Sequence, residues 1–224
     1  MRKHILIFVL VITAISFVSI NMTHRPVAVI YDPLSVDHGP SPIGAILSNA
    51  GYDVTIYIDH DATVNIFKSL SQKTNLIVLR VHSSIHHGNI WVFTGEPYSN
   101  EKHSIDQLVD NVHKAKTHPD GAYLFALSSG FFSDHVPELN GAQVLVLGCD
   151  AAASDDLANV FLEKGISSFI SRDGPVSLDH TDAVCVKIIE QITLGASAET
   201  AAEIALDEYG CDPHFKSRLI CIKQ

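Results

Sequence analysis

Blocks of apolar residues alternate along the chain with stretches that have an amphipathic, helical periodicity. A short apolar block bounded by turn residues is typical of a strand in a parallel sheet, which is buried on both faces. The predicted strands are 26–31, 54–58, 76–81, 90–94, 123–127, 144–148 and 168–171. The predicted helices are one that ends at Ala50 and the segments 63–70, 104–116, 157–164, 181–194 and 198–209. This alternation predicts an α/β fold, a three-layer α/β/α sandwich with a mostly parallel sheet.

The first 23 residues have a different pattern. Arg2 and Lys3 give the chain a basic start, and residues 5–20 are almost continuously apolar. Such a start is typical of a secretory signal peptide or of a short membrane anchor. The sequence has no clear small-x-small cleavage site before Asn21, so both alternatives stay open. We therefore expect residues 24–224 to form a single domain outside the cytoplasm, either secreted or held at the membrane by the N-terminal segment.

Composition narrows the class of protein. The 224 residues carry a formal charge of −10, so we expect no nucleic-acid partner, because no basic surface is available to neutralise its phosphates. Of the four cysteines, Cys185 lies in an apolar helical segment and is expected in the core. Cys211 and Cys221 flank a short tail, and a disulfide between them is as much expected as two free thiols.

Two of the apolar blocks end in residues that cysteine hydrolases use. The block 76–81 runs into His82, and the block 144–148 runs into Cys149, after which an alanine-rich turn opens a helix. If both strands are parallel, these side chains share the rim where open α/β sheets form their ligand crevice. A thiol is a good nucleophile when a base lies beside it and when helical N–H groups that favour an anion follow it. We therefore expect Cys149 to be a nucleophile and His82 to act as its general base and then as a general acid.

This pair resembles the caspase, gingipain and legumain clan of cysteine peptidases, and especially the gingipain-like and related caspase-fold domains of prokaryotes. Members carry a histidine and then a cysteine after two successive apolar strand blocks, as His82 and Cys149 do here. The chain after Cys149 is also similar, with a helix, a strand at 167–171, a long helix and then an alanine-rich helix. The resemblance covers most of residues 25–208. It implies a caspase-like sandwich, a Cys–His dyad without a required third member, and cleavage of a peptide or protein substrate.

The resemblance also implies substrate-binding residues. In the family, the residue that selects the P1 side chain often lies near the end of the first strand or beside the cysteine, where this chain has Asp32 and Asp150. An acidic pocket favours Arg or Lys at P1, although both residues also fit as caps of a turn and of a helix. Ser83 stands where the family usually has a glycine whose N–H helps to form the oxyanion hole. Asp173 follows the strand 168–171 and either lines the pocket or forms a turn.

Two other functions fit the sequence. In amidotransferase-like hydrolases the cysteine also sits on a strand-to-helix turn, but the histidine follows it, so that His180 would be the partner of Cys149. Alternatively, the chain keeps the peptidase fold as a binding domain without turnover, which the serine at position 83 favours. We expect neither a metal nor a cofactor, because the histidines lack the spacing of a zinc site and no phosphate-binding glycine motif follows the first strand.

Overall fold

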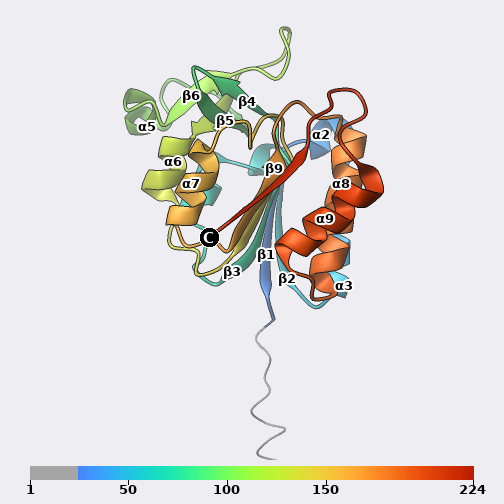
Figure 1. Ribbon diagram of the computed structural model, residues 1–224. Coiled ribbons are helices and arrows are strands. Elements are labelled where there is room, and N and C mark those ends of the chain that lie inside the picture. The colour runs from blue at the N-terminus through green and yellow to red at the C-terminus, as the bar shows by residue number, and fades with distance from the viewer. Residues whose placement is uncertain (1–24) are drawn as a thin grey trace, which may run out of the picture.

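Six strands form the larger of two sheets in the computed structural model, which describes residues 25–224 (Figure 1). The strands lie in the order β10-β9-β8-β3-β1-β2, and all neighbours are parallel except β10, which runs antiparallel to β9. Their bounds are β1 Val27–Asp32, β2 Asp53–Ile58, β3 Thr74–Leu79, β8 Gln143–Val146, β9 Ser168–Arg172 and β10 Leu219–Lys223. The protein is therefore an α/β protein with a mixed, mostly parallel sheet.

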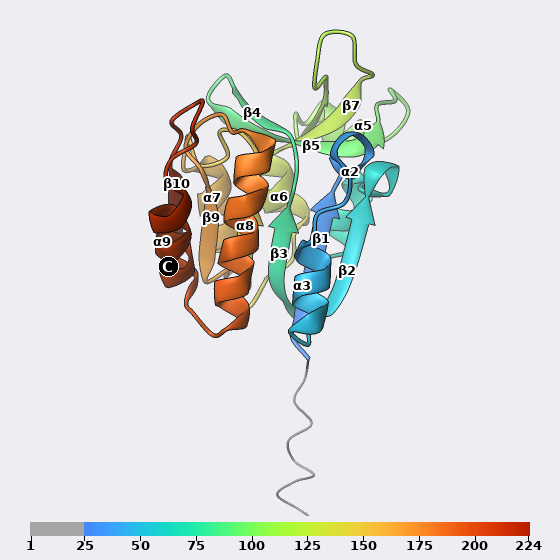
Figure 2. The same ribbon diagram turned by 90° about the vertical axis from the view of Figure 1, so that its right-hand side faces the viewer.

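A second, antiparallel sheet stands above the carboxyl ends of the parallel strands. It has the strand order β4-β5-β7-β6 and follows directly from β3 (Figure 2). Its strands are β4 Ser83–His86, β5 Asn89–Pro97, β6 Val112–Ala115 and β7 Leu124–Ser128. The predicted strand 90–94 is part of β5, which pairs with β4 as a hairpin.

Helices lie on both sides of the larger sheet, as Figures 1 and 2 show. On one side are α4 Val64–Lys68, α6 Ser129–His135 and α7 Asp156–Glu163. On the other side are α3 Ile43–Asn49, α8 Leu178–Thr193 and α9 Ala198–Tyr209. Short helical turns complete the chain: α2 Ser35–His38, η1 Asp59–Asp61 and α5 Ser104–Leu108.

The central strands are buried on both faces, which explains why they read as continuous apolar blocks. In β3, Ile77 and Leu79 join the core below α6 and α7, whereas Leu76 and Val78 join the core below α8 and α9. The same alternation holds in β8. Because each strand faces two apolar layers, its sequence shows no polar alternation, and its boundaries were predictable to within about two residues.

One prediction about the elements is wrong, and two elements were not predicted. The predicted helix 104–116 is only the short α5, and its C-terminal half forms β6, because pairing with β7 buries Val112 while Leu108 on α5 remains exposed. The connection before β8 contains helix α6, which buries Phe131 and Phe132 against the core. The C-terminal strand β10 was not predicted at all.

Two further predictions concern the termini. The N-terminal signal peptide or anchor lies outside the described residues, and none of the helices within residues 25–224 is long and apolar enough to cross a membrane. The disulfide considered for Cys211 and Cys221 is absent, since both are free thiols, with Cys211 exposed and Cys221 in the edge strand β10.

The prediction that Cys185 lies in the core is confirmed, because its side chain is fully buried.

Candidate functional site

The two strands that precede His82 and Cys149 are direct neighbours. β3 and β8 pair in parallel with Leu79 opposite Val146, and the N–H of Leu147 donates to the carbonyl of Leu79 at 2.7 Å. His82 and Cys149 each follow this last pair by three residues, so they lie at the same level above the sheet. The expectation that both strands are parallel and end at one rim is confirmed.

Strand alternation places both side chains on the side of helix α8. Val81 packs into the core on the α6 and α7 side, whereas Arg80 points the other way and binds Asp182 of α8. We infer from the same alternation that His82 and Cys149, one residue after Val81 and Gly148, face that α8 side. The two residues therefore share a level and a face of the rim.

Gly148 and Ser83 occupy the opposite face and fit each other. A Cβ at Gly148 would lie 2.1 Å from the hydroxyl oxygen of Ser83, so only glycine leaves room for this serine. The Ser83 hydroxyl donates to the carbonyl of Cys149 at 2.5 Å. Ser83 is an ordinary strand residue of β4, so it is placed without a positive φ, and its hydroxyl joins β4 to the backbone of Cys149.

Both reactive groups are held in their neutral forms. Burial raises the pKa of the Cys149 thiol, and a hydrogen bond from the N–H of Val176 opposes this shift. Burial also lowers the pKa of His82, helped by the nearby His38. At neutral pH the imidazole can therefore accept a proton and the thiol can give one, although within residues 25–224 neither is the other's hydrogen-bond partner.

The turn after Cys149 is held by backbone hydrogen bonds to the next strand. Asp150 has a φ of 59°, and its N–H donates to the carbonyl of Gly174 at 3.0 Å. The N–H of Ala152 donates to the carbonyl of Arg172 at 2.8 Å. Helix α7 begins only at Asp156, so the expectation that a helix N-terminus lies at the thiol is wrong, and the N–H of Val176 is the donor found there instead.

Asp32 is placed at the rim but is already bound. It is 2% exposed, and its carboxylate accepts a hydrogen bond from Arg80 at 2.9 Å. Arg80 also makes a two-point contact with Asp182, with N–O distances of 2.9 and 2.8 Å. The charge of Asp32 is therefore compensated inside the protein.

The other two predicted acidic residues differ from each other. Asp173 accepts hydrogen bonds from the backbone N–H and the Nε of Arg218, at 2.6 and 3.1 Å. Asp150 has no such cation among residues 25–224: its side chain is half-buried, and burial raises its pKa. Of the three carboxylates, that of Asp150 lies nearest to Cys149 in the chain and raises the pKa of the thiol.

His180 lies on α8 and faces helix α9. Its ring is 6.4 Å from that of Tyr209 and is hydrogen-bonded to the backbone of Gly210. Its Nε2 is buried without a hydrogen-bond partner among the residues described. Burial lowers the pKa of His180, and the charge of Arg172 lowers it further.

The sequence analysis missed the residue that fixes the loop next to the cysteine. Asp212 is fully buried and accepts hydrogen bonds from the N–H groups of Ser177, His214 and Phe215, at 2.6, 2.9 and 2.9 Å. Although burial alone would raise its pKa, these hydrogen bonds hold the pKa of Asp212 well below its usual range. The Asp-Pro pair at position 212 is a turn signal that could have indicated this role.

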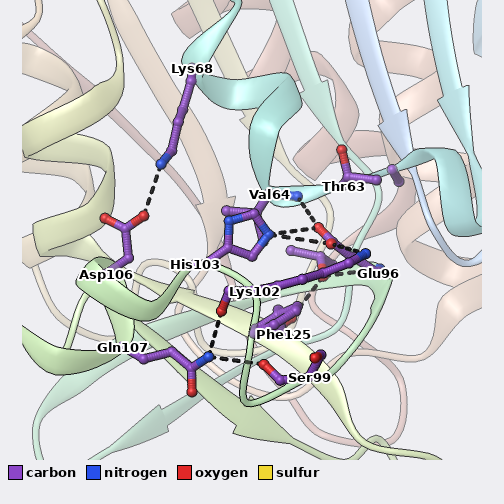
Figure 3. Close-up of polar contacts among 12 residues, drawn as sticks. Thr63, Val64, Lys68, Glu96, Ser99, Lys102, His103, Asp106, Gln107 and Phe125 are labelled. Atoms are coloured by element: carbon purple, nitrogen blue, oxygen red, sulfur yellow. Dashed lines mark hydrogen bonds and ion pairs between the residues drawn. The ribbon is translucent and has the colours of Figure 1, made fainter.

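A second polar cluster lies around Glu96 of β5, in the antiparallel sheet, and the sequence did not indicate it. Glu96 is buried and accepts hydrogen bonds from the N–H of Val64, from Lys102 and from His103, at 3.1, 2.9 and 3.1 Å (Figure 3). These contacts fix the chain after β5 to the start of α4. Despite its histidine and carboxylate, the cluster is not a metal site, and no group of three metal-ligating side chains occurs anywhere in the described range.

A comparison with models of known protein families finds no match to this sequence, and a comparison with curated proteins finds none either. The functional interpretation therefore depends on the rim itself. That rim carries a half-buried thiol, a neutral imidazole, a backbone donor and an acidic side chain, all at the carboxyl edge of the parallel strands.

Proposed function

We propose that this protein is a cysteine endopeptidase with a caspase-like, three-layer α/β/α fold, in which Cys149 is the nucleophile and His82 the general base. The observation that carries the proposal is the parallel register of β3 and β8, which ends at Leu79 and Val146 and supports a position for the two residues at one level and on one face of the rim. The helices on both sides of the sheet support the proposed fold (Figure 1).

The chemistry follows from the two neutral groups. When the carbonyl carbon of a substrate approaches the thiol, His82 accepts the proton from Sγ, and the thiolate forms a bond to that carbon. The tetrahedral intermediate collapses as the peptide C–N bond breaks and His82 returns the proton to the leaving amine. A water molecule, deprotonated by His82, then attacks the thioester and releases the acid product and the free thiol.

The backbone around the cysteine supports the charge that develops. The N–H of Val176 already donates toward Sγ and stabilises a thiolate there. The fit between Ser83 and Gly148 accommodates the residue that departs from the family pattern, so that the serine does not displace the cysteine. We therefore treat Ser83 as a positioning residue for the carbonyl of Cys149.

For specificity, we propose that Asp150 favours a Lys or Arg side chain at P1. Asp32 and Asp173 are each bound to an arginine of the protein itself, whereas Asp150 is free of such a partner among the residues described. A charge-assisted hydrogen bond to a substrate cation contributes about 1.5–3 kcal/mol. We expect Asp150→Asn to reduce kcat/KM for substrates with Arg at P1 by roughly 10- to 100-fold, with substrates that have Leu at P1 unaffected.

A binding domain without turnover is the second candidate. It is favoured by the raised pKa of the Cys149 thiol and by the lack of a hydrogen bond between the thiol and His82 in the described part of the chain. The amidotransferase-like alternative requires His180 to reach Cys149, and the ring of His180 is instead hydrogen-bonded to the backbone of Gly210. Attachment to a membrane or export, encoded in residues 1–23, stays a prediction.

The test combines labelling of the thiol with peptide cleavage. One sample of the protein and of each of its Cys149→Ala, His82→Ala and His180→Ala variants is labelled with iodoacetamide, and a separate, unlabelled sample is assayed on a peptide library with varied P1. We expect cleavage to vanish in Cys149→Ala, to fall by roughly 10²- to 10⁴-fold in His82→Ala, and to persist in His180→Ala.

Cys221→Ala is the matched control for loss of a half-buried thiol, because Cys221 lies in the edge strand β10, two strands away from β8. Loss of cleavage in His180→Ala with full activity in His82→Ala would replace the proposed dyad with the amidotransferase-like one. Labelling of Cys149 no faster than that of Cys221, with no cleavage of any peptide, would favour the binding domain.

A further inference from the structure

The antiparallel sheet carries a groove on the face that points away from the core. Its inner face supplies Ile90, Val92 and Leu127 to the main core. Its outer face lines a groove of about 850 Å³, whose residues include Ser84, His86, Trp91, Phe93, Asn111 and His113. The proposed peptidase mechanism uses none of these side chains.

The floor of this groove begins beside His82. The N–H of Phe93 donates to the carbonyl of His82 at 2.9 Å, and the two rings lie with their centroids 6.5 Å apart. Phe93 pairs with Ala126 on β7, and Ala126 pairs with His113 on β6. One row of neighbouring residues therefore leads from the proposed base across the whole sheet, so a chain bound at Cys149 has a continuous path into the groove.

The groove offers aromatic surface and an indole donor that lacks an acceptor. Trp91 and Phe93 form part of its apolar surface, and the indole N–H of Trp91 is buried with no hydrogen-bond partner among residues 25–224. His86 and His113 add imidazoles along its length, whereas the Lys114 ammonium lies over the ring of Tyr123 outside the groove. Asp110 is the one carboxylate in the lining, and it is already hydrogen-bonded to His113 at 2.9 Å.

This composition contrasts with the chain as a whole, which carries a formal charge of −10. A groove with several imidazoles and one carboxylate, which is already hydrogen-bonded, is a relatively non-acidic surface on an acidic protein, and the indole N–H of Trp91 lacks an acceptor among the described residues. An acidic peptide segment supplies both carboxylate and carbonyl acceptors, and an adjacent apolar side chain can pack on the aromatic residues.

We propose that this groove is a substrate-binding site for an extended peptide segment that carries Glu or Asp next to an apolar residue. The segment lies on one side of the bond that Cys149 attacks. This proposal rests on the proposed peptidase function, because the bound segment is taken to be part of the peptide substrate. It adds a second site of substrate selection, separate from Cys149 and His82. Ser84 on the edge strand β4, opposite Trp91, marks the entrance.

The test measures binding apart from cleavage. The probe is a fluorescein-labelled ten-residue peptide with a central arginine followed by two Leu-Glu pairs, and its affinity for the Cys149→Ala protein is measured by fluorescence anisotropy. A second peptide has the same pairs on the other side of the arginine, and a third has glutamine in place of glutamate. We expect the better-binding glutamate peptide to lose at least 5-fold in affinity on the change to glutamine.

Ser84→Trp, made in the same Cys149→Ala protein, fills the groove from a half-exposed position without removing a core side chain. We expect it to weaken binding of that peptide at least 10-fold. Ser69→Trp, at an exposed position outside the groove, is the matched control and should leave the affinity unchanged. His113→Ala is a second groove variant at an exposed position and should weaken binding at least 3-fold.

Each result decides between the groove and the dyad. Equal affinity in Ser84→Trp and Ser69→Trp, or no measurable binding of any of the peptides, overturns the proposed groove. Equal affinity for glutamate and glutamine peptides overturns its acidic preference. If binding depends on Ser84 and His113 as expected while the unsubstituted protein cleaves nothing, the groove is supported and the proposed peptidase function fails.

Discussion

Two buried arginines lie on either side of Cys149 along the rim, and they differ sharply in their partners. Arg80, just after β3, is 2% exposed, and its guanidinium is bound by Asp32, by Asp182 and by the carbonyl of Gly39. Arg172, at the end of β9, is 1% exposed and makes one side-chain hydrogen bond, to the carbonyl of Ser217 at 3.2 Å. Its Nε and Nη2 have no partner in the described structure.

The difference shows that the two halves of the rim are held by different forces. On the His82 side, one guanidinium joins β1, β3 and α8 through charge-assisted hydrogen bonds. On the other side, the loop 211–217 is fixed by the buried carboxylate of Asp212 and its backbone N–H partners, while Arg172 contributes little. We infer that Arg80 is part of the framework that positions the proposed base, and that Arg172 is not essential to the fold.

The largest expected effect comes from removing each arginine in turn. Arg80→Met leaves Asp32 buried without its cation, so we expect the free energy of unfolding to fall by about 3–5 kcal/mol. Arg172→Met removes a cation that lacks partners, and we expect a loss of about 1 kcal/mol or less. Urea unfolding of both variants measures the contrast, and equal losses would contradict this view of the rim.

The next effect tests the carboxylate that holds the other half. Asp212→Asn weakens hydrogen bonds to a charged acceptor, and we expect a loss of about 2 kcal/mol at pH 7. The pKa of Asp212 is lowered in the folded protein, so its stabilisation is complete above the unfolded value of about 3.9 and is lost as the pH falls through the folded value. The loss caused by Asp212→Asn should therefore shrink between pH 7 and pH 2.5, and a constant difference would assign its effect to packing.

The smallest effect concerns the base itself. Because burial lowers the pKa of His82, kcat/KM should stay level from pH 8 to about 6.5 and fall only at lower pH, as the imidazole becomes protonated. The charge of Asp37 raises this pKa, so Asp37→Asn should move the midpoint further toward acid. A level profile from pH 5 to pH 8 would count against His82 as the base.

The sequence predicted those helices and strands whose own residues are buried in a regular pattern. The block that became β3 is apolar throughout because both of its faces are buried, and the helix that became α9 ends where the periodicity and Gly210 indicate. The segment 104–116 was predicted as a helix because its apolar residues recur with helical spacing. The structure leaves Ile105 and Leu108 exposed, and only the strand partner β7, which is distant in sequence, explains why Val112 is in a strand.

The candidate site divides in the same way. His82 and Cys149 could be found because each follows a block that had to be a buried strand, and polar residues at such strand ends are visible in the sequence. The partners of the acidic residues could not be found, because Asp32 and Asp182 meet at Arg80 across separations of 48 and 102 residues. The groove was also not predictable, since its row from His82 to His113 exists only through the pairing of three strands and the hydrogen bond that joins His82 to Phe93.

The sequence by itself thus determined the strand blocks, the main helices and the two candidate residues at the strand ends, because hydrophobic periodicity reflects burial that each segment imposes locally. The tertiary structure alone decided that β3 and β8 are neighbours, that Asp32 is neutralised by an arginine while Asp150 has no such partner among the described residues, and that a groove with aromatic and imidazole side chains opens beside His82. These features depend on contacts between residues far apart in the chain, and such contacts are fixed only when the sheet order is formed.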